Sequence, residues 1–185
     1  MQYIGDFKMA TMTTATNKNL KSGSERGFSL IELLIVVAII LIIAAIAVPN
    51  LIRSKIAANE SSATGSVRSI VTAQVAYSTT FGIGFATSLT TLGSSTISCS
   101  ATSTSACLLD PLLSSGTKSG YTLATSALGI NNVDFVVTAV PSTPNLTGNR
   151  VFCSDETMVL RYQLGGSAPA DDLSCEALSP ISQGL

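Results

Sequence analysis

The sequence predicts an α+β fold in which one long N-terminal helix, membrane-spanning in its first half and amphipathic in its second, packs on a small antiparallel sheet. Three observations support this prediction. Residues 33–48 contain no polar side chain, apolar residues then recur at three- and four-residue spacing as far as Thr80, and four short β-prone segments follow between Tyr121 and Leu164.

Composition narrows the function classes. The chain has 185 residues, of which 11% are charged, against about 25% in ordinary soluble domains. Its ten basic and eleven acidic residues leave a net charge of −1, which excludes a strongly basic nucleic-acid binder. The absence of histidine excludes metal sites and acid–base devices built on imidazole. We therefore expect a protein that is not an enzyme and uses no cofactor.

A membrane-spanning segment is expected at residues 28–48, which are interrupted only by Ser29 and Glu32. At 1.5 Å per residue these 21 residues cover roughly 31 Å, the thickness of a bilayer hydrocarbon core. Residues 1–27 carry four basic and two acidic side chains, a net charge of +2. By the positive-inside rule, this end stays in the cytoplasm and the rest of the chain is exported.

Glu32 is the unusual residue of this segment, because a carboxylate at the centre of such a helix costs roughly 2.5–3.5 kcal/mol. A partner cation inside the membrane would offset that cost. A free α-amine, created by cleavage just upstream of Glu32, would supply one.

The stretch from Arg26 to Val37 (RGFSLIELLIVV) resembles the processing signature of type IV prepilins and the related pseudopilins. The resemblance implies a pilin fold, removal of residues 1–27 as a leader by prepilin peptidase between Gly27 and Phe28, and N-methylation of Phe28. It also implies assembly into a helical filament through the N-terminal helix. There Glu32 would pair with the Phe28 amine of a neighbouring subunit and set the register.

The same resemblance implies the partners and the location of the protein. The partners would be further copies of the chain, prepilin peptidase, the inner-membrane assembly machinery of a pilus or secretion system, and membrane lipid before assembly. The precursor would be a single-pass protein of the bacterial inner membrane, and the mature subunit would reach the periplasm or a cell-surface filament.

Beyond the membrane segment, residues 49–80 are expected to continue the helix. Pro49 lacks the N–H of an interior helical hydrogen bond, so a kink rather than a stop is predicted there. One departure from the family pattern is Leu41, where related pilins often have a glycine that helps the helix unwind. The apolar stripe of the second half is formed by Ile52, Ile56, Ala63, Val67, Ile70, Val71 and Gln74.

The remainder divides into three expected regions. Residues 81–119 are rich in Ser and Thr and predict a connector with one short helical turn. Residues 120–164 predict an antiparallel sheet, and residues 165–185 predict an irregular C-terminal loop. The four expected strands are Tyr121 to Ala127, Val133 to Val140, Arg150 to Ser154 and Met158 to Leu164.

All four cysteines follow the membrane segment, and an even number in an exported region favours disulfides. Three pairings are possible, and locality favours Cys99–Cys107 with Cys153–Cys175. A metal site is not expected. The acidic group Asp171, Asp172 and Glu176 is a weak calcium candidate, and an ordinary solvated loop is the alternative.

Three functions are compatible with the sequence. The first is a structural subunit of a type IV pilus, and the second is a pseudopilin of a type II secretion system. The third is a minor or competence pilin with a binding head. The region from Phe28 onward has six basic and nine acidic residues, a net charge of −3, so strong nucleic-acid binding is not expected.

Overall fold

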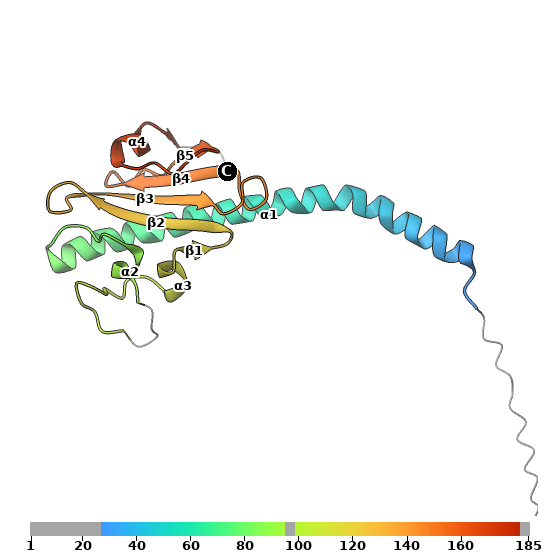
Figure 1. Cartoon of the computed structure of the whole chain (residues 1–185), viewed down its shortest axis with the longest axis horizontal. Coiled ribbons are helices and arrows are strands. Elements are labelled where there is room, and N and C mark those ends of the chain that lie inside the picture. The colour runs from blue at the N-terminus through green and yellow to red at the C-terminus, as the bar shows by residue number, and fades with distance from the viewer. Residues whose placement is uncertain (1–26, 95–98, 182–185) are drawn as a thin grey trace, which may run out of the picture. The chain divides into compact units, whose positions relative to one another are not determined.

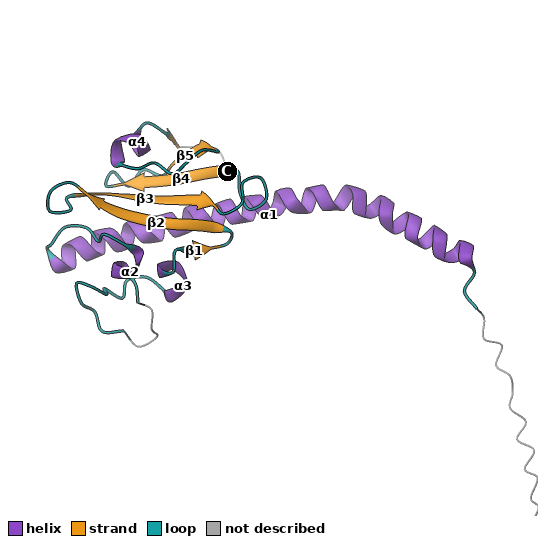
Figure 2. Cartoon of the chain, viewed as in Figure 1, coloured by secondary structure: helices purple, strands orange, loops and turns teal. Residues whose placement is uncertain are grey.

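The computed structural model describes residues 27–94 and 99–181, which fall into two compact units, one ending at Ile42 and one beginning at Ile43. The predicted leader up to Arg26 lies outside the described residues. The helix α1 runs from Leu30 to Phe81, and an antiparallel sheet follows it along the chain (Figure 1, Figure 2). The sheet has six strands. The α+β prediction is confirmed.

The helix α1 begins where the carbonyl of Ser29 accepts the N–H groups of Glu32 and Leu33, at 3.1 and 3.2 Å. It passes through Pro49 without interruption. At that point the Asn50 side-chain amide donates to the carbonyl of Ile46 at 3.3 Å. The helix therefore continues past the proline, which lacks an N–H of its own. The kink at Pro49 stays a prediction.

The sheet is a meander in which each strand pairs antiparallel with the next along the chain. The strands are β1 (Thr117–Lys118), β2 (Tyr121–Leu128), β3 (Asp134–Pro141), β4 (Arg150–Asp155), β5 (Arg161–Leu164) and β6 (Ser179–Pro180). The two edge strands have two residues each, too few for an alternating pattern to show in the sequence, and were not predicted.

The last predicted strand, Met158 to Leu164, begins three residues later in the structure, at Arg161. A turn at residues 156–157 follows β4 and precedes these three residues. The Asp155 carboxylate accepts the backbone N–H of Thr157 at 3.0 Å and also its hydroxyl, and Met158 adopts a φ of 59°. This local hydrogen bonding competes with strand pairing and delays the start of β5.

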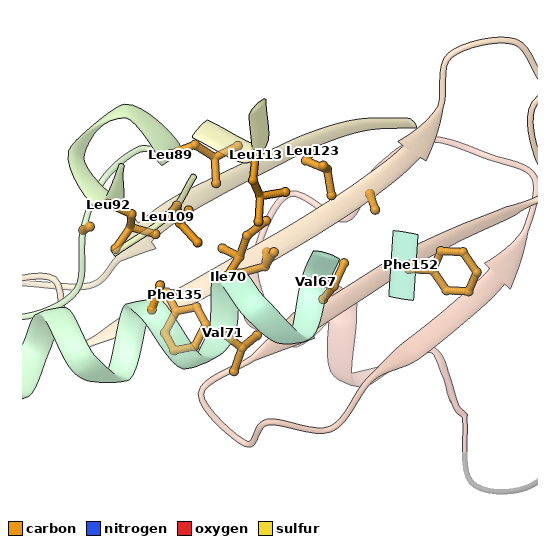
Figure 3. Packing of buried hydrophobic residues seen from close by; sticks show 14 of the residues in the cluster. Val67, Ile70, Val71, Leu89, Leu92, Leu109, Leu113, Leu123, Phe135 and Phe152 are labelled. Carbon is orange, nitrogen blue, oxygen red and sulfur yellow. The ribbon is translucent and has the colours of Figure 1, made fainter. Parts of the chain in front are cut away.

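The inner face of the sheet packs on the second half of α1. The helix contributes Val67, Ile70 and Val71, and Figure 3 shows them facing Phe135 of β3 and Phe152 of β4. Within this core the Gln74 amide is fully buried. It donates to the carbonyl of Ala86 and to the hydroxyl of Thr125, and it accepts the N–H of Ala86, each at 2.8 Å. Because every hydrogen bond is satisfied, this polar group is tolerated in the core.

The connector holds two short helices rather than the one predicted turn: α2 (Leu89–Leu92), capped by Ser88, and α3 (Pro111–Ser114), capped by Asp110. The C-terminal region was expected to be irregular, and that expectation was wrong for α4 (Asp172–Glu176) and for β6. A helix of five residues is too short for apolar periodicity to predict it.

The outer face of the sheet is covered by the α4 region. Val136 of β3 and Cys153 of β4 form a small second core with Cys175 of α4, and Leu128 and Leu178 pack against it. The central strands β3 and β4 are therefore buried on both faces. We call the described residues from 53 to 181 the head.

Candidate functional site: the apolar helix and its junction with the head

The first half of α1 exposes a long apolar surface. The large apolar side chains between Phe28 and Ile52 are 40–79% exposed, whereas Ile70 on the same helix is fully buried. Over the described residues, α1 is the helix long and apolar enough to cross a membrane. Exposed aliphatic surface on this scale marks contact with a membrane or with other proteins.

The predicted processing and register residues lie at the start of this helix. Phe28 is 79% exposed, and Gly27 and Phe28 precede the first helical turn. Glu32 lies in that turn, where a carboxylate interacts favourably with the positive end of the helix dipole. In the part of the chain that the structure describes, the Glu32 carboxylate makes no ion pair. Its pairing with a Phe28 amine stays a prediction.

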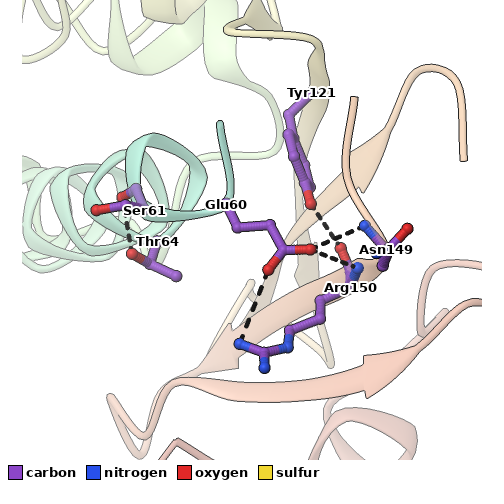
Figure 4. A network of polar contacts seen from close by, with 6 residues as sticks. All are labelled: Glu60, Ser61, Thr64, Tyr121, Asn149 and Arg150. Carbon is purple, nitrogen blue, oxygen red and sulfur yellow. Dashed lines mark hydrogen bonds and ion pairs between the residues drawn. The ribbon is translucent and has the colours of Figure 1, made fainter. Parts of the chain in front are cut away.

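A polar network joins α1 to the sheet where the helix enters the head (Figure 4). The Glu60 carboxylate accepts the backbone N–H groups of Asn149 and Arg150 at 2.8 and 3.2 Å, and it lies 3.7 Å from the Arg150 guanidinium. The Tyr121 hydroxyl donates to the Arg150 carbonyl at 2.9 Å. We call these four residues the Glu60 network. Each hydrogen bond that the Glu60 carboxylate accepts is worth about 1.5–3 kcal/mol, the range for hydrogen bonds to charged groups.

Close packing and burial hold the Glu60 network in place. Gly148 lies against the ring of Tyr121 so closely that a Cβ at this position would overlap the ring. Burial, reinforced by the charge of Glu60, raises the pKa of the Tyr121 hydroxyl well above its ordinary value of 10. The hydroxyl therefore stays protonated and remains a hydrogen-bond donor. The Arg150 guanidinium also lies 5.2 Å from the centre of the Tyr162 ring, within cation–π range.

The sequence prediction did not include the Glu60 network. The signal was present, because Glu60 lies four residues after Ile56 and three before Ala63, on the apolar stripe of the helix. A carboxylate on a face that packs against the sheet requires partners there. The identity of those partners, about 90 residues further along the chain, could not be predicted.

The structure contains the disulfides Cys99–Cys107 and Cys153–Cys175. The second links β4 to α4 across 22 residues, and both of its cysteines are fully buried. A loop of that length gives about 3 kcal/mol of stabilisation in the chain-entropy model. This bridge fastens the C-terminal segment to the outer face of the sheet.

The weak calcium candidate, Asp171, Asp172 and Glu176, forms a helix end instead. The Asp171 carboxylate accepts the Ser174 N–H at 2.8 Å and caps α4, and its hydrogen bonds to Ser174 lower its pKa. Across residues 27–94 and 99–181, no three His, Cys, Asp or Glu side chains are grouped so that they could hold a metal ion. The capping geometry accounts for Asp171 without a bound ion.

A second acidic group lies at the end of β4. The Asp155 side chain is fully buried, and one of its oxygens and one of Glu156 have no hydrogen-bond partner among the described atoms. Burial raises the pKa of Glu156, and the nearby carboxylates Asp155, Asp134 and Asp172 raise it further. These side chains therefore repel one another when they are all ionised.

A long apolar helix followed by an antiparallel sheet is a pilin-like architecture. Residues 23–48 match a family model described as the prokaryotic N-terminal methylation motif. Over 52 residues the chain is 50% identical to the type IV major pilin protein PilA of Myxococcus xanthus, an alignment that covers 28% of this chain. The aligned part spans about a quarter of that relative, 24% of its length. No solved structure matches the chain at a significant level.

Proposed function

We propose that this protein is a structural subunit of a type IV pilus, made as a membrane-anchored precursor and assembled into a filament through α1. The observation that carries this proposal is the apolar, exposed first half of α1, most of which lies within the matched methylation motif. The partial similarity to a major pilin supports the pilus over other uses of the motif.

Packing against other copies accounts for the apolar surface once the subunit leaves the membrane. Burying one large aliphatic side chain contributes about 1.5–3 kcal/mol, and this helix exposes more than a dozen of them. Such packing is strong but permits many registers. The Glu32 carboxylate and the Phe28 amine of a neighbouring subunit supply one attractive pair that selects a register.

The proposed processing is tested by intact-mass spectrometry of subunits from sheared surface fibres. We expect an N-terminal methylated Phe28 and a mass lower by four hydrogens than that of the reduced chain, because the structure contains two disulfides. An unprocessed N-terminus in assembled fibres would contradict the proposal. A trace component of fibres built from another protein would instead indicate a minor pilin.

The register role is tested with Glu32→Ala, and Ser29→Ala serves as the control because it removes the other polar side chain of the same segment. We expect the Glu32 variant to be cleaved and inserted, with fibre yield reduced by more than about tenfold. An ion pair at 4 Å is worth about 4 kcal/mol at an effective dielectric of 20, which accounts for a loss of that size. Normal fibre yield from Glu32→Ala would rule out the register role.

A pseudopilin of a type II secretion system is the alternative, and deletion of the gene separates the two. Loss of surface fibres with normal secretion of exoproteins supports the pilus. Loss of exoprotein secretion with fibres intact supports the pseudopilin.

A further inference from the structure

An open groove lies where α1 meets the head, beside the Glu60 network. It has a volume of about 220 Å³. Its walls are one face of α1 and the facing ends of β4 and β5, with the lining side chains Arg53, Ile56, Ala57, Glu60, Arg150 and Leu164. All of these residues belong to the unit that begins at Ile43.

The charge of the groove favours an anion. The Glu60 carboxylate already accepts two backbone N–H groups and pairs with Arg150, so its negative charge is satisfied. Arg53 makes no hydrogen bond or ion pair with the described residues, and its guanidinium carries five donors. With two arginines and one glutamate, the groove has a net charge of +1, and Arg53 is its unpaired cation.

The walls also favour an apolar group. Ile56 and Ala57 line the helix side, and Leu164 at the end of β5 is 75% exposed, although it is a large aliphatic residue. A fully hydrated anion would gain nothing from these side chains. The groove therefore suits an anion that carries a carbon-bearing group which can pack on these side chains.

The position of Arg53 along α1 identifies such a molecule. The uninterrupted apolar run ends at Val48, and Arg53 follows five residues later, about 7.5 Å further along a helix. The polar headgroup layer adds about 5–8 Å to each side of the hydrocarbon core. When residues 28–48 span the bilayer, Arg53 lies at the depth of the lipid phosphates on the exported side.

We propose that this groove binds the headgroup of an anionic phospholipid, such as phosphatidylglycerol, while the subunit waits in the membrane. The lipid phosphate pairs with Arg53, and the acyl chains extend back along α1 toward Val48. The polar headgroup extends outward into the groove toward Arg150, and its glycerol carbons pack on Ile56 and Leu164. The proposal rests on the proposed function, because it requires α1 to span a membrane. It assigns the groove the task of holding the head against the membrane surface before assembly.

The chain contains a matched control for this site. Lys55 is exposed, carries the same charge as Arg53 and lies two residues further on, which is about 200° around the helix. Lys55 does not line the groove. A general attraction of the basic residues to an anionic membrane would involve both side chains, whereas a lipid bound in the groove involves Arg53.

The test is native mass spectrometry of the full chain ejected from nanodiscs that contain equal amounts of phosphatidylglycerol and phosphatidylcholine with identical acyl chains. We expect more retained phosphatidylglycerol than phosphatidylcholine, and a preference reduced by about fivefold in Arg53→Gln, the effect of about one basic residue near a membrane surface. Lys55→Gln should keep the preference. The four basic residues of segment 1–27 add the same background to every variant.

Several results would overturn the proposal. Equal loss in Lys55→Gln indicates diffuse charge attraction, and displacement of the lipid by inorganic phosphate indicates a site for free anions. A groove that instead holds a second copy would show no lipid preference and would lose fibres in Arg53→Gln. A chain that does not insert into nanodiscs contradicts the proposed function itself, whereas a chain that inserts without lipid preference contradicts this inference alone.

Discussion

The two halves of α1 follow opposite rules of burial. From Leu30 to Ile52 the helix exposes aliphatic side chains all round, whereas from Glu60 to Tyr77 one face is apolar and buried against the sheet. A helix that is apolar all round is stable only where other molecules surround it. The comparison shows that the second half folds with its own chain and that the first half depends on partners outside it.

The largest effect we predict compares one isoleucine from each half. Ile70→Ala should lower the free energy of unfolding of the head by about 2–5 kcal/mol, because Ile70 is fully buried and its truncation leaves a cavity. Ile40→Ala should leave that stability unchanged, because Ile40 is 58% exposed and is not one of the buried core residues.

The measurement is urea unfolding of the full chain in mild detergent, followed by near-ultraviolet circular dichroism. The buried Tyr77 and Tyr121 report on the head, and the chain has no tryptophan to obscure them. Equal losses in the two variants would show that the first half of α1 contributes to the folding of the head, and the division between the halves would then be wrong.

A smaller effect is predicted for the two glutamates of α1. Glu60→Gln should destabilise the head by about 1–3 kcal/mol, since it weakens two hydrogen bonds to a charged acceptor and removes the ion pair with Arg150. Glu32→Gln should not change head stability, because Glu32 belongs to the compact unit that ends at Ile42 and makes no ion pair among the described residues.

The same urea titration measures this pair, and the midpoint should move only for the Glu60 variant. An additional Arg150→Gln variant separates the contributions, because it leaves the backbone N–H groups of Asn149 and Arg150 in place. We expect Arg150→Gln to cause only part of the loss, because the Arg150 side chain is 34% exposed and an ion pair that water reaches contributes little. If Arg150→Gln alone reproduces the whole loss, the backbone hydrogen bonds contribute little.

The sequence predicts the elements that repeat a pattern. The 52 residues of α1 contain many turns of apolar spacing, and β2 alternates buried and exposed side chains along most of its length. It does not predict β1, β6 or α4, whose two to five residues are too few for a period. Glu32 lies in a local sequence motif, and its register role is a prediction that rests on that motif. The Glu60 network is not local, because Glu60 lies on α1 and its hydrogen-bond partners lie in the β3–β4 loop and β4.

The smallest predicted effect is a pH dependence of the head, which arises from Glu156 near the end of β4. Burial and the carboxylates Asp155, Asp134 and Asp172 raise its pKa above the ordinary value of 4.5, so the folded head binds this proton more tightly than the unfolded chain does. The resulting stabilisation is complete below about pH 4.5 and is lost as the pH rises through the raised value. Hence the head should become more stable as the pH falls from neutral toward that window.

Glu156→Gln should remove this slope and make the head more stable than the wild type at pH 7, with the difference shrinking as the pH approaches 4.5. The contribution of Asp171 has the opposite sign, because its pKa is lowered and the stabilisation is lost as the pH falls below 3.8. The pH ranges in which Asp171 and Glu156 act therefore do not overlap. Thermal unfolding of the two proteins between pH 4.5 and pH 7 measures the effect. Parallel dependence of stability on pH in the two proteins would show that burial and the neighbouring carboxylates do not raise the pKa of Glu156. A slope that Glu156→Gln abolishes would place the pH response in the head.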